Sequence, residues 1–368
     1  MKNNIFTTVL ISLIMIFSLL FLEILLPIFD NRGETIWRKD SHTKNLNMIN
    51  SNIFFSKGTF DTELGWDHAV PSISDEVKYI AESYGDSFTE SGFSNDKTWQ
   101  EQFYKLSNLG IINLGVGGYG LDQSILKFEQ YSREKKFNNS RNVILGLYGQ
   151  VFKRSVSYYS YYYFFNEFFK YAFKPIFVRD NSEFRLLEIP CQNSECLKHE
   201  LENLNSATYA NLNKYDYWYK KEIRKPILKF PRIISYAKAI PSIIHRKKQR
   251  NFLEPTYFED EESIELAKYL IFRFCEKAYI QDSNPIMLLM YDRFGLEGII
   301  EGKREDEWLI RFLSENKITF IDTSPFLISY IKNKGNIDEL FLLDGHYTFK
   351  GDSLIALSIY NDIHKFKL

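Results

Sequence analysis

The sequence has 368 residues, which is long for one minimal domain but comfortable for a single α/β domain that carries an insertion. Its 46 basic and 47 acidic residues nearly cancel, and the motifs of RNA- and DNA-binding domains are absent, so we expect no nucleic-acid partner. The 32 phenylalanines and 24 tyrosines, beside 18 glycines and 10 prolines, exclude a disordered or fibrous chain.

A short tail at residues 1–4 precedes an apolar run at residues 5–29. The run is long enough to cross a bilayer, which takes about 20 residues, and no small-residue cleavage site follows it. We therefore expect a single-pass transmembrane signal anchor, with the rest of the chain on the extracytoplasmic side of the membrane. Charges stand on both flanks, with Lys2 before the run and Arg32 and Arg38 after it, and they do not fix the orientation.

An irregular polar lead-in is expected at residues 30–76, and apolar strand-like runs then alternate with helical patterns. This alternation predicts a parallel sheet of about five strands in one domain at residues 77–368, interrupted by an aromatic-rich insertion at about 155–260. Strands are expected at 78–83, 111–116, 142–148, 285–291 and 318–322. Helices are expected at 98–110, 121–136, 262–279, 305–315, 325–332 and 351–363.

The three cysteines leave one question open. Cys191 and Cys196 are close enough in sequence to form a loop disulfide outside the cytosol, and equally they could be unpaired surface thiols. Cys275 lies in a helical pattern and is expected in the core. No group of histidines and cysteines has the spacing of a zinc site, so we expect no metal and no cofactor.

Ser87 is the candidate nucleophile. It stands on a Gly-Asp turn at the end of the first predicted strand, and ligands of parallel sheets bind at the carboxyl ends of strands. A second Gly-Asp-Ser occurs at Gly351, Asp352 and Ser353, with no strand before it. We interpret this second copy as the cap of the last helix.

His346 is the candidate base, because a serine hydroxyl needs a neighbouring group that takes its proton. Of the six histidines it alone lies in a loop near the carboxyl end with an acid, Asp344, two residues before it. Asp344 is expected to orient the imidazole and to stabilise its charged form.

Backbone N–H groups of a glycine-rich loop are the candidate oxyanion donors. The segment from Asn113 to Gly120 holds four glycines directly after a predicted strand, and it lacks the Lys-Ser/Thr of a phosphate-binding P-loop. The side-chain amide of Gln150, after the third strand, is a further candidate donor.

These blocks, in this order, resemble the SGNH (GDSL-like) hydrolases over most of the chain from residue 78 onward, the insertion excepted. The resemblance implies a three-layer α/β/α, flavodoxin-like domain in which Ser87 is both nucleophile and oxyanion donor and Gly118 is a second donor. Gln150 stands where the family usually has asparagine, and Val151 stands where it has aspartate. Gly345 alone separates Asp344 from His346, where two residues are often found.

Three further features resemble a membrane-anchored subgroup of bacterial envelope or polysaccharide-locus hydrolases. They are the D-x-x-x-G-W stretch from Asp61 to Trp66, the pattern N-x-G-x-x-G-Y-G-x-x-Q that ends at Gln123, and the K-P-x-F stretch from Lys174 to Phe177. The resemblance implies an ester substrate, for example a small acyl group esterified to an envelope glycan.

The predicted activity is that of a serine esterase or deacylase acting through an acyl-enzyme on Ser87. An O-acyltransferase with the same triad is the alternative among enzymes. A non-catalytic envelope or polysaccharide-assembly factor on the same fold is the alternative from another class, and the Gln150 and Val151 replacements motivate it.

Overall fold

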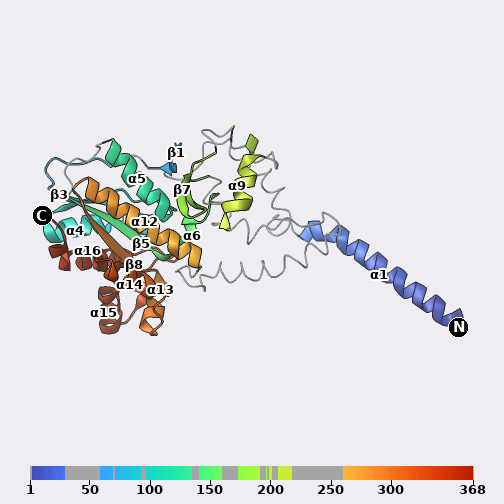
Figure 1. The fold of residues 1–368 in the computed structure, drawn as a ribbon. Coiled ribbons are helices and arrows are strands. Elements are labelled where there is room, and N and C mark those ends of the chain that lie inside the picture. Colours follow the sequence, from blue (N-terminus) through green and yellow to red (C-terminus); the bar gives the residue numbers. More distant parts are fainter. Residues whose placement is uncertain are drawn as a thin grey trace.

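The computed structural model shows an α/β domain built on a parallel sheet (Figure 1). It describes residues 2–29, 59–68, 71–92, 97–134, 141–159, 173–190, 196, 199–200, 206–217 and 260–367. The sheet has five strands in the order β4-β3-β5-β8-β9, and all neighbours pair in parallel. Counted along the chain, this is the order 2-1-3-4-5 of flavodoxin-like sheets. The expected α/β class with a five-stranded parallel sheet is therefore confirmed.

Each strand lies within a few residues of its expected range. All seven residues of the central strand β5 are buried, as expected for a parallel strand covered on both faces. The strands are β3 (Tyr79–Tyr84), β4 (Gly110–Asn113), β5 (Asn142–Tyr148), β8 (Asn284–Met290) and β9 (Phe320–Asp322).

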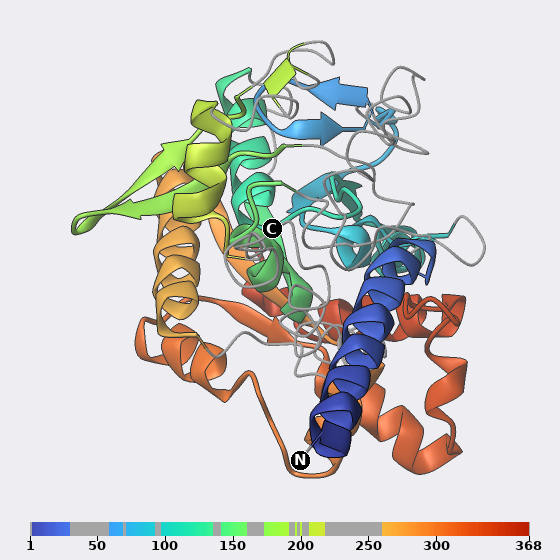
Figure 2. The same cartoon turned by 90° about the vertical axis from the view of Figure 1, so that its right-hand side faces the viewer.

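Helices cover both faces of the sheet (Figures 1 and 2). One face carries α5, α6 and α12, and rings of Phe128 and Phe274 join α5 to α12 at 5.0 Å between centroids. The other face carries α4, α15 and α16. The bounds are α4 (Trp99–Ser107), α5 (Leu121–Arg133), α6 (Gly149–Ser155), α12 (Glu261–Ile280), α13 (Arg293–Ile300), α14 (Glu307–Glu315), α15 (Ser324–Lys334) and α16 (Phe349–Asn361).

Helix ends correct two of the sequence expectations. Helix α4 begins with the expected capping box of Thr98 and Glu101, but it ends at Asn108, whose φ is 58°, and not at Gly110, which begins β4. The cap of α16 is Thr348, whose side chain accepts a hydrogen bond from Gly351 N–H. The second Gly-Asp-Ser therefore lies inside the first turn of α16 and is not its cap, because Thr348 already supplies the acceptor.

Residues 5–29 form most of a helix, α1 (Lys2–Phe29), whose apolar side chains, Phe17 and Ile24 among them, are exposed. The expected transmembrane span is not supported: no helix among the described residues is long and apolar enough to cross a membrane.

Two antiparallel hairpins lie outside the main sheet, and neither was expected. The lead-in contains β1 (Thr59–Asp61) and β2 (Gly65–Asp67), and the insertion contains β6 (Ile176–Asp180) and β7 (Glu183–Leu187) followed by α9 (Ala207–Tyr215). Much of the aromatic block of the insertion, at 160–172, lies outside the described residues.

The cysteines differ in state. Cys196 is disulfide-bonded, whereas Cys275 is free and buried in α12, as expected. Cys191 lies outside the described residues.

Candidate active site

Ser87 is the first residue of the short helix α3 (Ser87–Glu90), which follows β3 directly. Asp86 caps this helix, and its carboxylate accepts a hydrogen bond of 3.0 Å from Phe88 N–H. Strand β3 lies between β4 and β5, where the order of the sheet reverses. Ligands of doubly wound sheets bind outside the carboxyl ends of the strands at this point, and Ser87 occupies it.

His346 lies beside the segment that carries Ser87. Its ring centroid is 5.6 Å from that of Phe88, the residue after Ser87. Its Nδ1 is 3.2 Å from Asp344 Oδ1, which also accepts a hydrogen bond of 3.1 Å from His346 N–H. Gly345 makes the tight turn between them, with a φ of 92° that favours glycine. The structure thus brings the histidine and its acid to the segment that carries the serine.

Asp86 is fully buried and is paired with Arg154 of α6, at 2.8 Å between Oδ2 and Nη1. Burial raises the pKa of the Asp86 carboxyl, and the charged Arg154 opposes part of that rise. Arg154 Nη1 also donates to the carbonyl oxygen of Tyr119 at 3.1 Å. The side chain of Arg154 therefore connects the turn that carries Ser87 to the end of the glycine-rich loop.

The glycine-rich loop packs closely on α3. A Cβ on Gly115 would lie 2.2 Å from the backbone nitrogen of Glu90, so that position requires glycine. A Cβ on Gly117 would lie 3.9 Å from Ser87 Cβ, which puts this part of the loop beside Ser87. Gly118 follows with a φ of 83°. The role of Gly118 as an oxyanion donor stays a prediction.

The β1–β2 hairpin of the lead-in fastens this loop from the other side. Trp66 Nε1 donates to Gly117 O at 3.1 Å, and Tyr119 Oη donates to Trp66 O at 2.5 Å. Gln123 Nε2 donates to Leu64 O at 2.7 Å, and Gln123 Oε1 accepts from Gly120 N–H. The residues that suggested a subgroup in the sequence are thus joined to one another around the loop.

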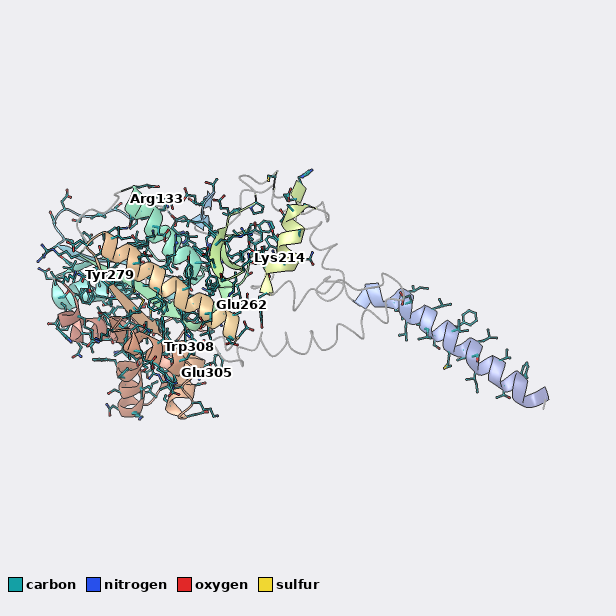
Figure 3. All side chains as sticks on the ribbon, in the orientation of Figure 1. Arg133, Lys214, Glu262, Tyr279, Glu305 and Trp308 are labelled. Carbon is teal, nitrogen blue, oxygen red and sulfur yellow. The ribbon has the colours of Figure 1, made fainter. Side chains whose placement is uncertain are left out.

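Two ion pairs anchor the hairpin to α5. Lys127 Nζ is 2.6 Å from Asp67 Oδ1, and both residues are buried. Arg133, at the end of the same helix, is 2.7 Å from Glu63 in the hairpin turn (Figure 3). The buried pair contributes more to holding the hairpin, because water screens the exposed one.

A second histidine, His68, follows the hairpin and reaches Glu90 of α3. Its Nε2 is 3.5 Å from Glu90 Oε1, while Glu90 Oε2 accepts a hydrogen bond of 2.9 Å from Gly117 N–H. The backbone oxygen of Glu90 also accepts from Asn113 Nδ2 at 2.7 Å. No sequence pattern selects His68 or Glu90, because their partners lie far away along the chain.

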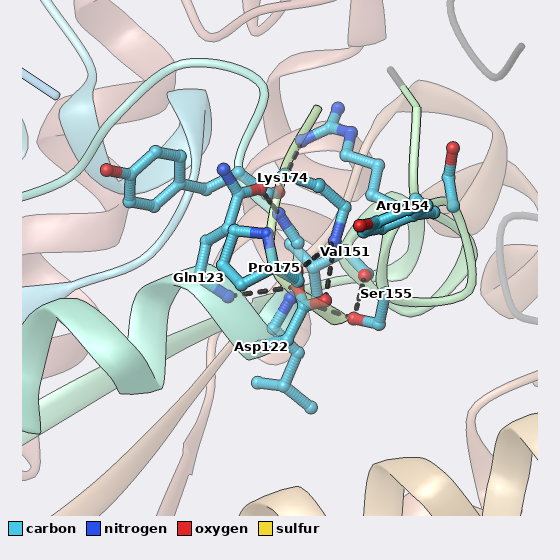
Figure 4. A network of polar contacts seen from close by, with 12 residues as sticks. Asp122, Gln123, Val151, Arg154, Ser155, Lys174 and Pro175 are labelled. Atoms are coloured by element: carbon cyan, nitrogen blue, oxygen red, sulfur yellow. Dashed lines mark hydrogen bonds and ion pairs between the residues drawn. The ribbon is translucent and has the colours of Figure 1, made fainter. Parts of the chain in front are cut away.

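Lys174, in the K-P-x-F stretch, makes a buried ion pair with Asp122 in the first turn of α5, at 2.5 Å (Figure 4). Burial lowers the pKa of the lysine and raises that of the aspartate, while each partner opposes the shift of the other. Nearby, Ser155 Oγ accepts from Leu121 N–H at 2.9 Å. The pair therefore fixes the insertion to the helix that begins at the glycine-rich loop.

Gln150 and Val151 occupy the first turn of α6, directly after β5. This places Gln150 at the same edge of the sheet as Ser87, and its side chain is half-buried. Val151 is fully buried in the core. An unpaired charged group at position 151 would have no water around it there, so an apolar side chain suits this position. The role of Gln150 as a donor stays a prediction.

Two buried acids flank the site. Asp292, after β8, accepts hydrogen bonds from Gly295 N–H and from Tyr148 Oη, and burial raises its pKa to about 6. Asp352 of α16 accepts from Ser91 Oγ at 2.6 Å, and burial raises its pKa to about 7. Ser91 is the C-cap of α3, so Asp352 connects α16 to that helix.

The described residues form no metal site, and a cavity that they line lies away from Ser87 and His346. Within the described ranges, no group of three histidine, cysteine, aspartate or glutamate side chains could hold a metal ion. A cavity of about 480 Å³ lies in the insertion, between β7 and α9, and neither Ser87 nor His346 lines it.

No protein-family model and no curated protein matches the sequence. Solved structures do resemble it. A lipase/acylhydrolase from Enterococcus faecalis is 9% identical, with a TM-score of 0.38 over 79% of this chain and 98% of that one. A catalytic mutant of Axe2, an acetylxylan esterase from Geobacillus stearothermophilus, is 9% identical, with a TM-score of 0.38 over 78% and 94%. A member of the lipolytic protein G-D-S-L family from Veillonella parvula is 13% identical, with a TM-score of 0.34 over 77% and 97%. No residue's role follows from likeness at this level.

Proposed function

We propose that the chain is a serine esterase of the SGNH type. The observation that supports this proposal most directly is that three segments far apart in the sequence meet at the switch point of the sheet. Ser87 begins α3, the ring of His346 lies against Phe88, and Gly117 lies beside Ser87. A nucleophile, a base and a glycine-rich loop are the parts that acyl transfer needs.

In this proposal the hydroxyl of Ser87 attacks the ester carbonyl while His346 takes its proton. The N–H groups of Ser87 and Gly118, with the amide of Gln150, bind the oxygen that becomes negative. His346 then gives its proton to the departing alcohol. Water attacks the acyl-enzyme in the second half of the reaction, with His346 again as base, and the acid and free serine are released.

We also propose that the enzyme works outside the cytosol on small acyl esters, such as O-acetyl groups on an envelope glycan. The disulfide bond of Cys196 supports the location, because such bonds persist in oxidising compartments. Labelling of Cys196 by a thiol reagent only after reduction, in protein taken directly from the native cell, would agree with this location. Labelling without reduction would contradict it.

The activity is tested with p-nitrophenyl acetate, butyrate and octanoate. We expect hydrolysis by the wild type and a loss of kcat on the order of 1000-fold in Ser87→Ala and in His346→Ala, because each removes a group that acts in the chemical step. A fluorophosphonate should add covalently to Ser87, as read by peptide mass spectrometry.

Ser353→Ala is the matched control, since it removes the serine of the other Gly-Asp-Ser. Ser353 is half-buried, and its Oγ donates to Phe349 O inside α16. Activity in this variant should equal that of the wild type. A folded wild type that neither hydrolyses the esters nor takes up the phosphonate would reject the proposal, and product formed only with a sugar acceptor present would replace it by the transferase.

A further inference from the structure

We propose that Trp66 is a positioning residue of the oxyanion hole, which it orients through the peptide group between Gly117 and Gly118. This inference rests on the function proposed above. The indole Nε1 of Trp66 donates a hydrogen bond of 3.1 Å to Gly117 O. That oxygen belongs to the same planar unit as the N–H of Gly118, the proposed donor to the oxyanion.

Fixing one end of a peptide group fixes the other. In a trans peptide the C=O and the N–H point in opposite directions, so a partner that holds the carbonyl also sets the direction of the N–H. A hydrogen bond accepted by the carbonyl polarises the unit and makes its N–H a better donor. Donors that are already oriented before the reaction stabilise the developing charge most, because nothing has to reorganise.

The peptide in question lies beside the nucleophile. A Cβ on Gly117 would lie 3.9 Å from Ser87 Cβ, and the N–H of Gly117 is held by Glu90 Oε2 at 2.9 Å. The peptide groups on both sides of the Gly117 Cα are therefore fixed, one by α3 and the other by Trp66. Gly118, with its φ of 83°, comes next.

Trp66 is itself fixed without any substrate. Its side chain is 1% exposed, and its ring meets that of Tyr119 edge-on at 5.7 Å. The hydroxyl of Tyr119 donates to the backbone oxygen of Trp66, and Leu64 and Val116 complete the small buried cluster. The indole is thus a rigid part of the β1–β2 hairpin, and this gives that hairpin a role in the reaction.

The test compares Trp66→Phe with the matched control Trp99→Phe. Both tryptophans are buried, but the indole N–H of Trp99 has no hydrogen-bond partner among the described residues. For p-nitrophenyl acetate we expect kcat to fall about 10-fold in Trp66→Phe with KM within about twofold, and neither to change in Trp99→Phe. The rate constant for phosphonylation of Ser87 should fall by the same factor, since the phosphoryl oxygen occupies the same hole.

If Trp66→Phe does not fold, Trp66 is instead replaced by benzothienylalanine. This residue has sulfur in place of the indole N–H and keeps the shape of the tryptophan side chain. The variant should show the same fall in kcat. An active wild type whose kcat survives this replacement would overturn the inference alone. An inactive, folded wild type would overturn the proposed function and this inference with it.

Discussion

Asp344, the acid of the proposed triad, is largely open to solvent. Its side chain is 60% exposed, although Oδ1 lies 3.2 Å from His346 Nδ1. Water screens an exposed carboxylate, so its electrostatic support of a charged imidazole is weak. We expect Asp344→Asn to lower kcat for p-nitrophenyl acetate only about 10-fold, against the much larger loss in His346→Ala. An equal loss in the two variants would show that Asp344 sets the tautomer of His346 and is not merely a nearby charge.

Asp352 makes stability depend on pH. Its pKa of about 7 lies above the usual value of 3.8, so the folded state holds this proton more tightly than the unfolded state does. The contribution is most favourable below pH 4 and is lost as the pH rises to about 7. Asp352→Asn keeps an oxygen for Ser91 Oγ and carries no charge.

The variant should therefore be more stable than the wild type at pH 8, by on the order of 2–4 kcal/mol, with the advantage gone near pH 4. Urea denaturation at a series of pH values measures this. A constant difference between the two proteins across the series would show that Asp352 does not titrate as described. Asp292 is present in both proteins, so its own titration contributes equally to both free energies of unfolding and does not affect their difference.

The sequence could identify Ser87, because a strand, a turn and a helix follow one another within a short window. Asp344 and His346 are also local to each other. Trp66 and Arg154 could not be found in this way, since the first contacts Gly117 and the second contacts Asp86 only after the chain has folded. The D-x-x-x-G-W stretch was visible as a pattern, but nothing in it says which backbone oxygen the indole will meet.

At the scale of elements, the β1–β2 hairpin is part of the folded domain and not an extended lead-in alone. It carries Asp67, whose buried partner Lys127 belongs to α5. A chain that starts at residue 58 keeps the hairpin, whereas one that starts at residue 77 loses Asp67, which pairs with Lys127 at 2.6 Å. We expect the shorter chain to lose about 3–5 kcal/mol of stability and to show a lower kcat. Thermal melting and ester hydrolysis compare the two, and equal melting temperatures would contradict the assignment.

The elements that the sequence predicted correctly have either a strong hydrophobic periodicity or a continuous run of apolar residues. Strand β5 is continuously apolar, and α12 is long and amphipathic, so both were recognisable. Strands β1 and β2 have only three residues each, which is too short for alternation to be seen. Strands β6 and β7 have only five residues each and follow the aromatic block of the insertion. Helix α13 has eight residues, two of which are glycines, so its helical pattern is weak.

At the scale of the whole molecule, the carboxyl-terminal segment closes the edge of the sheet opposite the site. Asn142, at the start of β5, accepts from Lys367 N–H at 2.8 Å and donates to Lys367 O at 2.9 Å. Phe366 is buried and stacks with Phe103 of α4.

Ending the chain after Asp362 should therefore lower the free energy of unfolding by about 3–5 kcal/mol, the usual effect of removing a buried phenylalanine. The kcat of the folded fraction should stay unchanged, because the strand ends that carry Ser87 are at the opposite edge. Lys367→Ala is the matched control and should be neutral, since the contacts to Asn142 use only the backbone of Lys367. A truncated chain as stable as the wild type would contradict this account.

The pairing of β5 with β8 also has a consequence for biosynthesis. Asn142 pairs with Asn284, so the two central strands meet only after the whole insertion between them has been made. A growing chain exposes the apolar face and the open edge of β5 throughout that interval, and such edges recruit other strands. We expect the newly synthesised polypeptide to need a holding chaperone until β8 emerges. Depletion of such chaperones should therefore reduce the yield of this protein. The reduction should exceed that of enzymes whose strands pair in the order of synthesis.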